Sequence, residues 1–297
     1  MKQITAWCAG LLTLAVLSSS ALADKFWGDG SPDWGAASPA LFRFDTISGT
    51  VETTYTYSDW SWIMDVEYAP GNILYAVHNT TADVYDFKLA KVDASTGTVL
   101  SDTLLNTLTG TDYPTWNALQ YYNGKLYGIE NNSWGSGYSA GLKRGYVYET
   151  TLAGNGDPLS VTLGAYMGPA PDGALAYRNG TFYASDWKSD TSSWIKTSTD
   201  IMNTNFSGTV GTSPGGFIAG WDFENDGDLL GVSWNNDFNV YKIDLATGSE
   251  TALYNLQSQL PGNLTMYGGL TIPEPSTIAQ LGLAVLALLI LRSRRAS

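Results

Sequence analysis

The sequence predicts an all-β protein, a single β-propeller-like domain of about five four-stranded blades. Aromatic residues make up 13% of the chain and glycine is abundant, while long helical periodicity is missing. This composition favours strands and turns. A short motif also recurs at a nearly constant period, with turn glycines at 71, 124, 180 and 227 that are 53, 56 and 47 residues apart. Four strands per unit at this period is typical of propeller blades.

The motif around these glycines consists of an apolar strand, an Asn-Gly-like turn and a second strand. Its copies cover residues 66–76, 119–128, 175–184 and 221–231. Two alternating segments that flank a Gly-containing turn predict a β-hairpin. We therefore expect each copy to form the first two strands of a blade.

A second motif is an alternating strand followed by Asp-x-x-Thr/Ser-Gly. It occurs at residues 41–49, 89–97 and 240–248. The alternation predicts the third strand of a blade, and the Asp and Gly positions predict the turn to the fourth strand.

The two ends of the repeat region predict how the ring closes. Residues 40–58 carry only the second half of a unit, and residues 267–271 resemble the start of one. Joined, they predict a fifth blade made from both ends of the domain, which removes exposed sheet edges. A β-sandwich built from the same hairpins is the alternative, but sandwiches do not usually repeat at a constant period. Residues 24–272 are thus expected to form one extracellular propeller-like domain.

The C-terminal segment, residues 273–297, has three parts. Pro273-Glu274-Pro275 precedes an apolar run over residues 278–291, and the basic residues Arg292, Arg294 and Arg295 follow. Fourteen helical residues span about 21 Å, less than the roughly 30 Å hydrocarbon core, although snorkelling arginine stems extend that reach. The positive-inside rule places the arginines in the cytoplasm. A buried core helix is the alternative.

The order of these parts resembles the PEP-CTERM sorting signal of Gram-negative bacteria. The resemblance covers about a tenth of the chain. It implies cleavage near the Pro-Glu-Pro motif by an exosortase, after transient anchoring in the inner membrane through the C-terminal transmembrane helix. The product would be displayed at the cell surface or in the extracellular matrix of bacteria that make exopolysaccharide.

The N-terminus predicts export as well. Lys2 precedes an apolar stretch, and Ala21 and Ala23 form the small-x-small pattern of a signal peptidase site. Cleavage after Ala23 would remove residues 1–23 as a signal peptide and leave Asp24 as the first residue. Cys8, the only cysteine, lies in this segment, so the secreted body is expected to fold without disulfides.

The body between the two signals is strongly acidic. It keeps 11 of the 15 basic residues and 27 of the 28 acidic residues, which gives a net charge of about −16. Such a charge makes nucleic acid and anionic membrane surfaces poor partners. Cations, neutral glycans and basic proteins are the partners that it allows.

One acidic run resembles a calcium loop. Asp222, Glu224, Asp226 and Asp228 alternate along it, as ligands do in such loops. The twelfth position is Ser233 and not the expected glutamate. The repeat also places this run at a hairpin turn, which explains the acidic residues without a metal. We expect no resident cofactor, and calcium at this run is the alternative.

Polar residues share another repeat position, the end of the second strand. His78, the only histidine, is equivalent there to Glu130, Asp186 and Ser233. Glu130 and Asp186, with Asn131, could bind a cation or act as acid and base. Solvated loop carboxylates are the alternative, and the chain offers no nucleophile motif. We therefore predict no catalytic residue.

Tryptophans follow the same strands, at Trp134, Trp187 and Trp234. On one rim of a propeller they would form a stacking platform for sugar rings, because indole is flat and apolar and has one donor. The alternative is that they pack between blades. Four more tryptophans precede first strands or lie close to them: Trp60, Trp62, Trp116 and Trp221.

These observations leave three hypotheses for function. The first is a non-catalytic exported protein that binds exopolysaccharide or another matrix component. The second is an extracellular hydrolase or lactonase-like propeller that uses rim carboxylates and a divalent cation. The third is a purely structural component of the envelope or biofilm.

Overall fold

A computed structural model describes twelve segments of the chain: residues 25–32, 38–80, 86–111, 114–131, 145–168, 171–189, 192–213, 218–224, 226–233, 238–261, 264–265 and 269–272. The expected signal peptide and the expected sorting segment lie outside them. Within these segments, no helix combines the length and the apolar character needed to cross a membrane.

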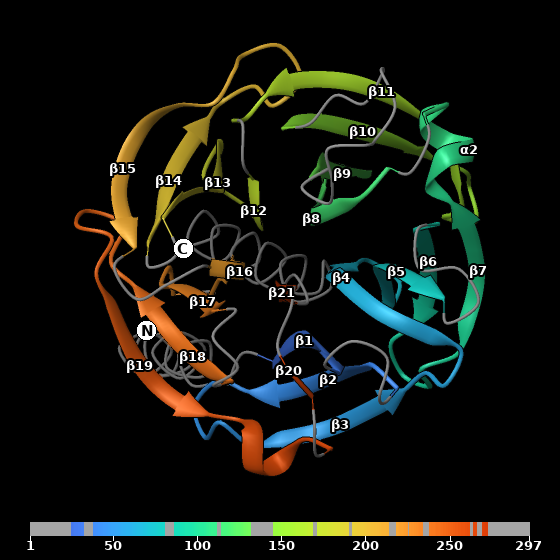
Figure 1. The fold of residues 1–297 in the computed structure, drawn as a ribbon, viewed down its shortest axis with the longest axis horizontal. Helices are drawn as coiled ribbons and strands as arrows, with labels where there is room; N and C mark the ends of the chain where they lie inside the picture. The colour runs from blue at the N-terminus through green and yellow to red at the C-terminus, as the bar shows by residue number, and fades with distance from the viewer. Residues whose placement is uncertain are drawn as a thin grey trace, which may run out of the picture.

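Five antiparallel sheets surround a central axis, as the all-β propeller prediction expects (Figure 1). The first blade contains β4 (Trp60–Ala69), β5 (Ile73–Thr80), β6 (Lys88–Asp93) and β7 (Val99–Leu104). The second contains β8 (Trp116–Tyr122), β9 (Lys125–Glu130), β10 (Tyr146–Leu152) and β11 (Pro158–Tyr166). The third contains β12 (Pro171–Arg178), β13 (Thr181–Ser189), β14 (Ser192–Ser198) and β15 (Ser207–Ser213). The fourth contains β16 (Ile218–Phe223), β17 (Leu229–Ser233), β18 (Asn239–Ile243) and β19 (Glu250–Asn255).

In each of these blades the first strand lies nearest the axis and the fourth lies outermost (Figure 1). Helical structure in the described segments is short. Helix α2 (Leu105–Thr109) follows the outer strand of the first blade, and the 3₁₀ helix η1 (Gln257–Gln259) follows that of the fourth.

The fifth blade joins both ends of the domain. Its inner strand is β21 (Leu270–Thr271), which pairs with β1 (Lys25–Pro32); β2 (Ala40–Asp45) and β3 (Val51–Thr56) follow outward. The short strand β20 (Leu264–Thr265) pairs with the end of β1. The prediction that segments from both ends share this blade is confirmed.

The fifth blade contains one strand that was not predicted. Residues 40–58 supply its two outer strands as expected, but the second strand is β1 and comes from the N-terminal side. Gly28, Asp29 and Gly30 interrupt the apolar alternation of this strand and are typical of a turn. The structure uses Gly28 for close packing, since a Cβ there would lie 3.0 Å from the Phe42 ring.

The two predicted turn motifs have the expected geometry. Asn123 and Gly124 both have positive φ, 51° and 79°, as a tight hairpin turn requires. In the other motif, the Asp45 carboxylate accepts hydrogen bonds from the N–H groups of Ile47 and Ser48, at 3.0 and 2.8 Å. This side-chain cap is the reason for the aspartate in that motif.

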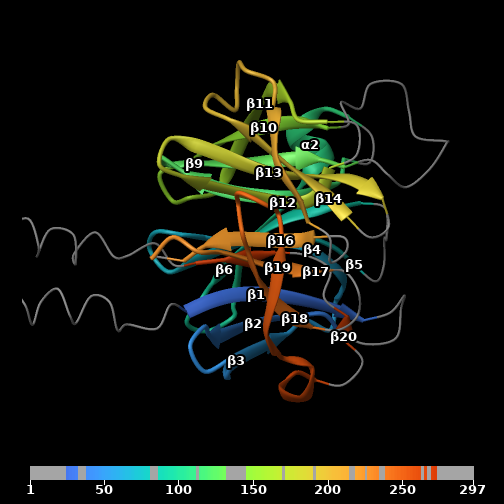
Figure 2. The same ribbon diagram turned by 90° about the vertical axis from the view of Figure 1, so that its left-hand side faces the viewer.

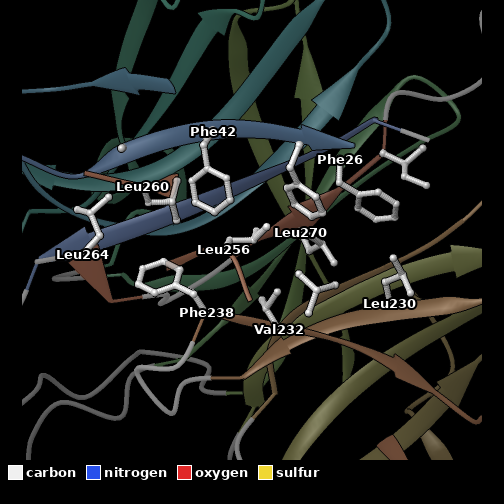
Figure 3. Packing of buried hydrophobic residues seen from close by; sticks show 13 residues of the cluster. Phe26, Phe42, Leu230, Val232, Phe238, Leu256, Leu260, Leu264 and Leu270 are labelled. Carbon is white, nitrogen blue, oxygen red and sulfur yellow. The ribbon is translucent and has the colours of Figure 1, made fainter. Parts of the chain in front are cut away.

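The apolar core lies between neighbouring blades. At the junction of the fourth and fifth blades, Phe26 and Phe42 pack with Val232 and Phe238 (Figure 3). Tryptophans on inner strands have the same role at other junctions. Trp60, Trp116 and Trp221 belong to buried clusters that join neighbouring blades, so for these three the packing interpretation is correct. Trp62 is buried as well.

The common strand order gives the ring two distinct faces. On one, the rim face, the second strands β5, β9, β13 and β17 end. On the other, the turn face, the inner strands end and the hairpin turns at Gly71, Gly124 and Gly180 lie. Thr271 pairs with Trp27, near the start of β1. The first described strand therefore begins, and the last one ends, on the turn face; β1 and the inner strand β16 can be followed in Figure 2.

Candidate functional site

Of the predicted ligand residues, Glu130 and Asp186 can be described in full, and both lie at the rim face. Glu130 ends β9, and Asp186 lies near the end of β13. Trp187 belongs to β13, with its side chain outside the description, and Trp134 and Trp234 lie outside the described residues. Glu130 and Asp186 are 0% and 3% exposed, so the alternative that they are solvated loop carboxylates is wrong.

Glu130, at the end of β9, is held by Thr115, which directly precedes the first strand of the second blade. Its Oε1 accepts a hydrogen bond from the N–H of Thr115 at 2.8 Å, and the adjacent N–H of Asn131 donates to the Thr115 carbonyl at 2.7 Å. Its Oε2 is buried and has no hydrogen-bond partner. Burial raises the pKa of Glu130 to about 8, because the charged carboxylate loses its hydration. The group is therefore mostly protonated at neutral pH.

Asp186 is charge-compensated within its own blade. It forms an ion pair with Lys196 on the adjacent strand β14, and the Lys196 ammonium also donates to the carbonyl of Met167 at 3.4 Å. A buried ion pair of this kind needs such additional hydrogen bonds to offset desolvation. The contacts make Asp186 part of the polar interior of the third blade.

His78 occupies the equivalent position in the first blade and is fully buried. Its Nε2 lies 2.9 Å from Asp102 Oδ1, and its Nδ1 lies 3.2 Å from the carbonyl oxygen of Asn79. The imidazole stacks on Trp60 with ring centroids 3.8 Å apart, and Trp60 stacks on Tyr57 at 4.0 Å. Both ring nitrogens and one ring face are thus occupied by the protein.

The predicted ring of acid and base groups is therefore not an open site in the part of the chain that the structure describes. His78, Glu130 and Asp186 share a repeat position, yet each binds partners near its own strand. Glu130 combines a raised pKa with a buried oxygen that lacks a partner.

The acidic run of the fourth blade forms the predicted turn. The N–H of Glu224 donates to the carbonyl of Asp228 at 2.7 Å, and the N–H of Gly227 donates to the carbonyl of Glu224 at 2.9 Å. Carboxylate oxygens of Glu224, Asp226 and Asp228 lie within 4.8 Å of one another, and Asp228 also pairs with Lys242. Asp222 does not join them, because its two oxygens accept the N–H groups of Phe223 and Ile272.

Sequence reasoning missed a set of polar residues on the inner strands. Glu67 Oε1 accepts the N–H of Tyr121 at 2.6 Å, and Asp222 Oδ2 accepts the N–H of Ile272 at 2.8 Å. Thr271 Oγ1 accepts the N–H of Tyr68 at 3.1 Å. In each case a side chain of one blade binds a backbone N–H on the inner strand of the next blade, or directly after that strand in the case of Ile272.

The register shows that these acceptors are equivalent in the repeat. Glu67 pairs with Tyr75, Asp222 with Leu230 and Thr271 with Trp27, always one residue before the Gly or Ala of the second strand. The sequence contained a signal for them, since a polar residue stands at this position of mostly apolar strands.

No family model matches the chain, and neither does any curated protein. A gluconolactonase from Xanthomonas campestris is 16% identical with a TM-score of 0.47, over 84% of this chain and 88% of that one. A glutaminyl cyclase from Myxococcus xanthus is 15% identical with a TM-score of 0.42, over 73% of each chain. A Bacteroides caccae protein of unknown function is 10% identical with a TM-score of 0.44, over 86% of this chain and all of that one.

Proposed function

We propose that this chain is an exported, exosortase-processed protein whose propeller body is a non-catalytic binding module for exopolysaccharide or another matrix glycan. The terminal segments support the export and sorting part of this proposal. Residues 1–23 have the pattern of a signal peptide, and residues 273–297 resemble a PEP-CTERM signal. Signal peptidase and exosortase are then the processing partners.

The observation that carries the binding part is the direction of the strands. Strand β21 ends on the turn face, next to the start of β1. The rim face, where β5, β9, β13 and β17 end, lies on the opposite side of the ring. A body held in the membrane by the segment after Ile272 would turn its rim face outward, toward the matrix.

The rim face also has suitable chemistry for a glycan. Trp187 lies close to the end of β13, and Trp134 and Trp234 follow the ends of the equivalent strands β9 and β17. An indole ring stacked on a sugar contributes on the order of 1 kcal/mol. The net charge of about −16 on the body favours neutral or cation-bridged glycans over nucleic acid.

The second candidate function is a hydrolase or lactonase-like activity, and one observation favours it. Glu130 has a pKa of about 8 and an oxygen without a partner, which are properties of acid and base groups near neutral pH. Its complete burial argues against this candidate, because a substrate cannot reach a carboxyl group that the protein covers. A purely structural matrix component is the third candidate.

A binding experiment tests the three candidates together. The exported body is screened on a glycan array and in pull-downs with exopolysaccharide, with and without calcium, and its turnover of lactones is measured in parallel. We expect glycan retention, several-fold weaker in each of the variants Trp134→Ala, Trp187→Ala and Trp234→Ala. Leu159→Ala, which changes a residue exposed on the outer strand β11, is the matched control and should bind as the parent does.

The other outcomes identify the other functions. Lactone turnover that disappears in Glu130→Gln would support the enzyme. A stable body that retains no glycan and turns over no lactone would leave the structural role. If all three tryptophan variants instead lose about 3–5 kcal/mol of stability, these residues pack between blades, and the rim platform is refuted.

A further inference from the structure

Two buried carboxylates lie against the same glycine at the junction of the fifth and first blades. Asp29 on β1 is 0% exposed and Asp65 on β4 is 4% exposed. Gly269, the residue before β21, lies against both of them. Its N–H donates to Asp29 Oδ2 at 2.6 Å, and a Cβ on it would collide with Asp65 Oδ1. The fifth and first blades therefore bring two acidic groups to the same glycine.

The hydrogen bonds of this pair are incomplete. The oxygens of Asp65 accept the N–H groups of Val66, at 2.8 Å, and of Leu119. Asp29 Oδ1 is buried and has no hydrogen-bond partner. Among the described residues, no Lys, Arg or His forms an ion pair with either carboxylate. Buried charge of this kind is costly unless something neutralises it.

We propose that a divalent cation of the calcium class binds between Asp29 and Asp65 and joins the fifth blade to the first. The available donors are carboxylate oxygens, which suit hard cations. Calcium tolerates irregular coordination and accepts backbone carbonyls or water as further ligands. The acidic body attracts cations in general. The pair of carboxylates provides a buried position where a cation would neutralise the charge.

A proton is the competing way to neutralise this pair. Burial raises the pKa of both carboxyl groups well above their ordinary value, and in Asp65 the nearby Asp29 charge adds to this effect. The free oxygen of Asp29 favours the cation, because a metal ion would bind it directly. The inference does not depend on the proposed glycan binding, since it concerns how the ring is held closed.

The exposed acidic turn of the fourth blade provides a matched control. Glu224, Asp226 and Asp228 also bring carboxylate oxygens together, but Asp228 already has Lys242 as its partner. Calcium that binds only there would not depend on Asp29 or Asp65. The substitution Asp226→Asn therefore separates the two places.

Thermal melting of the full chain in mild detergent, first treated with a chelator and then titrated with CaCl2 or MgCl2, tests the proposal. At a calcium concentration about 100 times the dissociation constant, we expect Tm to rise by about 5–10 °C. The rise should disappear in Asp29→Asn and Asp65→Asn and persist in Asp226→Asn. No rise at all, a rise that only Asp226→Asn abolishes, or a Tm that responds to pH but not to metal would overturn the proposal.

A second measurement does not depend on the folding of the variants. Crystals of the wild-type chain soaked in MnCl2 locate bound metal by its anomalous scattering. A peak between the carboxylates of Asp29 and Asp65 is the expected result. Peaks confined to the turn at Glu224, Asp226 and Asp228, or no peak within the ring, would contradict the proposed site.

Discussion

The carboxylate of Glu67 in the first blade accepts a hydrogen bond from the backbone N–H of Tyr121 in the second blade, at 2.6 Å. The inner strand of a propeller blade is an edge strand, and edge strands have unpaired N–H groups. A side chain from the preceding blade supplies the missing acceptor. Asp222 and Thr271 do the same at the two junctions of the fifth blade, so polar contacts near the axis add to the apolar packing between blades.

Glu67→Leu is expected to destabilise the domain by about 1–3 kcal/mol. It removes the acceptor for the N–H of Tyr121 and for the side-chain amide of Gln120, which donates to Glu67 at 2.9 Å, and an unsatisfied buried donor has about this cost. Glu67→Gln retains one acceptor and should lose less. Urea unfolding measures both variants, with Asp59→Leu at an exposed position as the control. Equal losses in Glu67→Leu and Asp59→Leu would contradict the role of this contact.

The repeat could be predicted from the sequence because its signals are local. Gly124 and Asp45 determine turn geometry together with neighbouring residues. The period at which their two motifs recur along the chain predicts the number of strands per blade. Strand β1 could not be predicted in this way. Its residues Gly28 and Gly30 are typical of a turn, and their place in a strand depends on pairing with β2 and on close packing against Phe42 and Leu264.

The chemistry of the candidate site was less predictable. The repeat placed Glu130 and Asp186 correctly at equivalent strand ends, but their burial depends on residues from other strands. Thr115 and Lys196 approach them only once the blades are folded. The pair of Asp29 and Asp65 joins two blades, and Asp29 lies on the second strand of the fifth blade, which was not recognised.

Removing residues 269–272 should unfold the whole domain and not only the fifth blade. The deletion removes Leu270 and Ile272 from the core between the fourth and fifth blades and opens the ring. Each large buried side chain contributes about 2–5 kcal/mol, and a domain of this kind has only about 5–15 kcal/mol in total. Circular dichroism and thermal melting check this result. Truncation after Ile272 is the control and should melt as the parent does; a folded protein without residues 269–272 would refute ring closure by β21.

Replacing Pro273, Glu274 and Pro275 by alanine should leave export intact and block release from the membrane. The signal peptide is expected to act at the N-terminus, whereas the exosortase would act at the Pro-Glu-Pro motif. Cell fractionation with an antibody against the body measures the retained and released forms. The prediction is wrong if the variant reaches the medium, without its tail, as efficiently as the parent does.

The pH dependence of stability should report the buried carboxyl group of Glu130. Burial raises its folded-state pKa to about 8 from the ordinary value of 4.5, so the folded protein keeps a proton that the unfolded chain releases. The resulting contribution to stability is complete below about pH 4.5, declines as the pH rises, and is fully lost above about pH 8. Glu130→Gln keeps a neutral side chain that can still accept the Thr115 N–H. We expect it to match the parent at pH 4 and to exceed its free energy of unfolding by up to a few kcal/mol at pH 9. Urea unfolding at several pH values compares the two, and a constant difference across this range would show that the pKa of Glu130 is not raised in the folded protein.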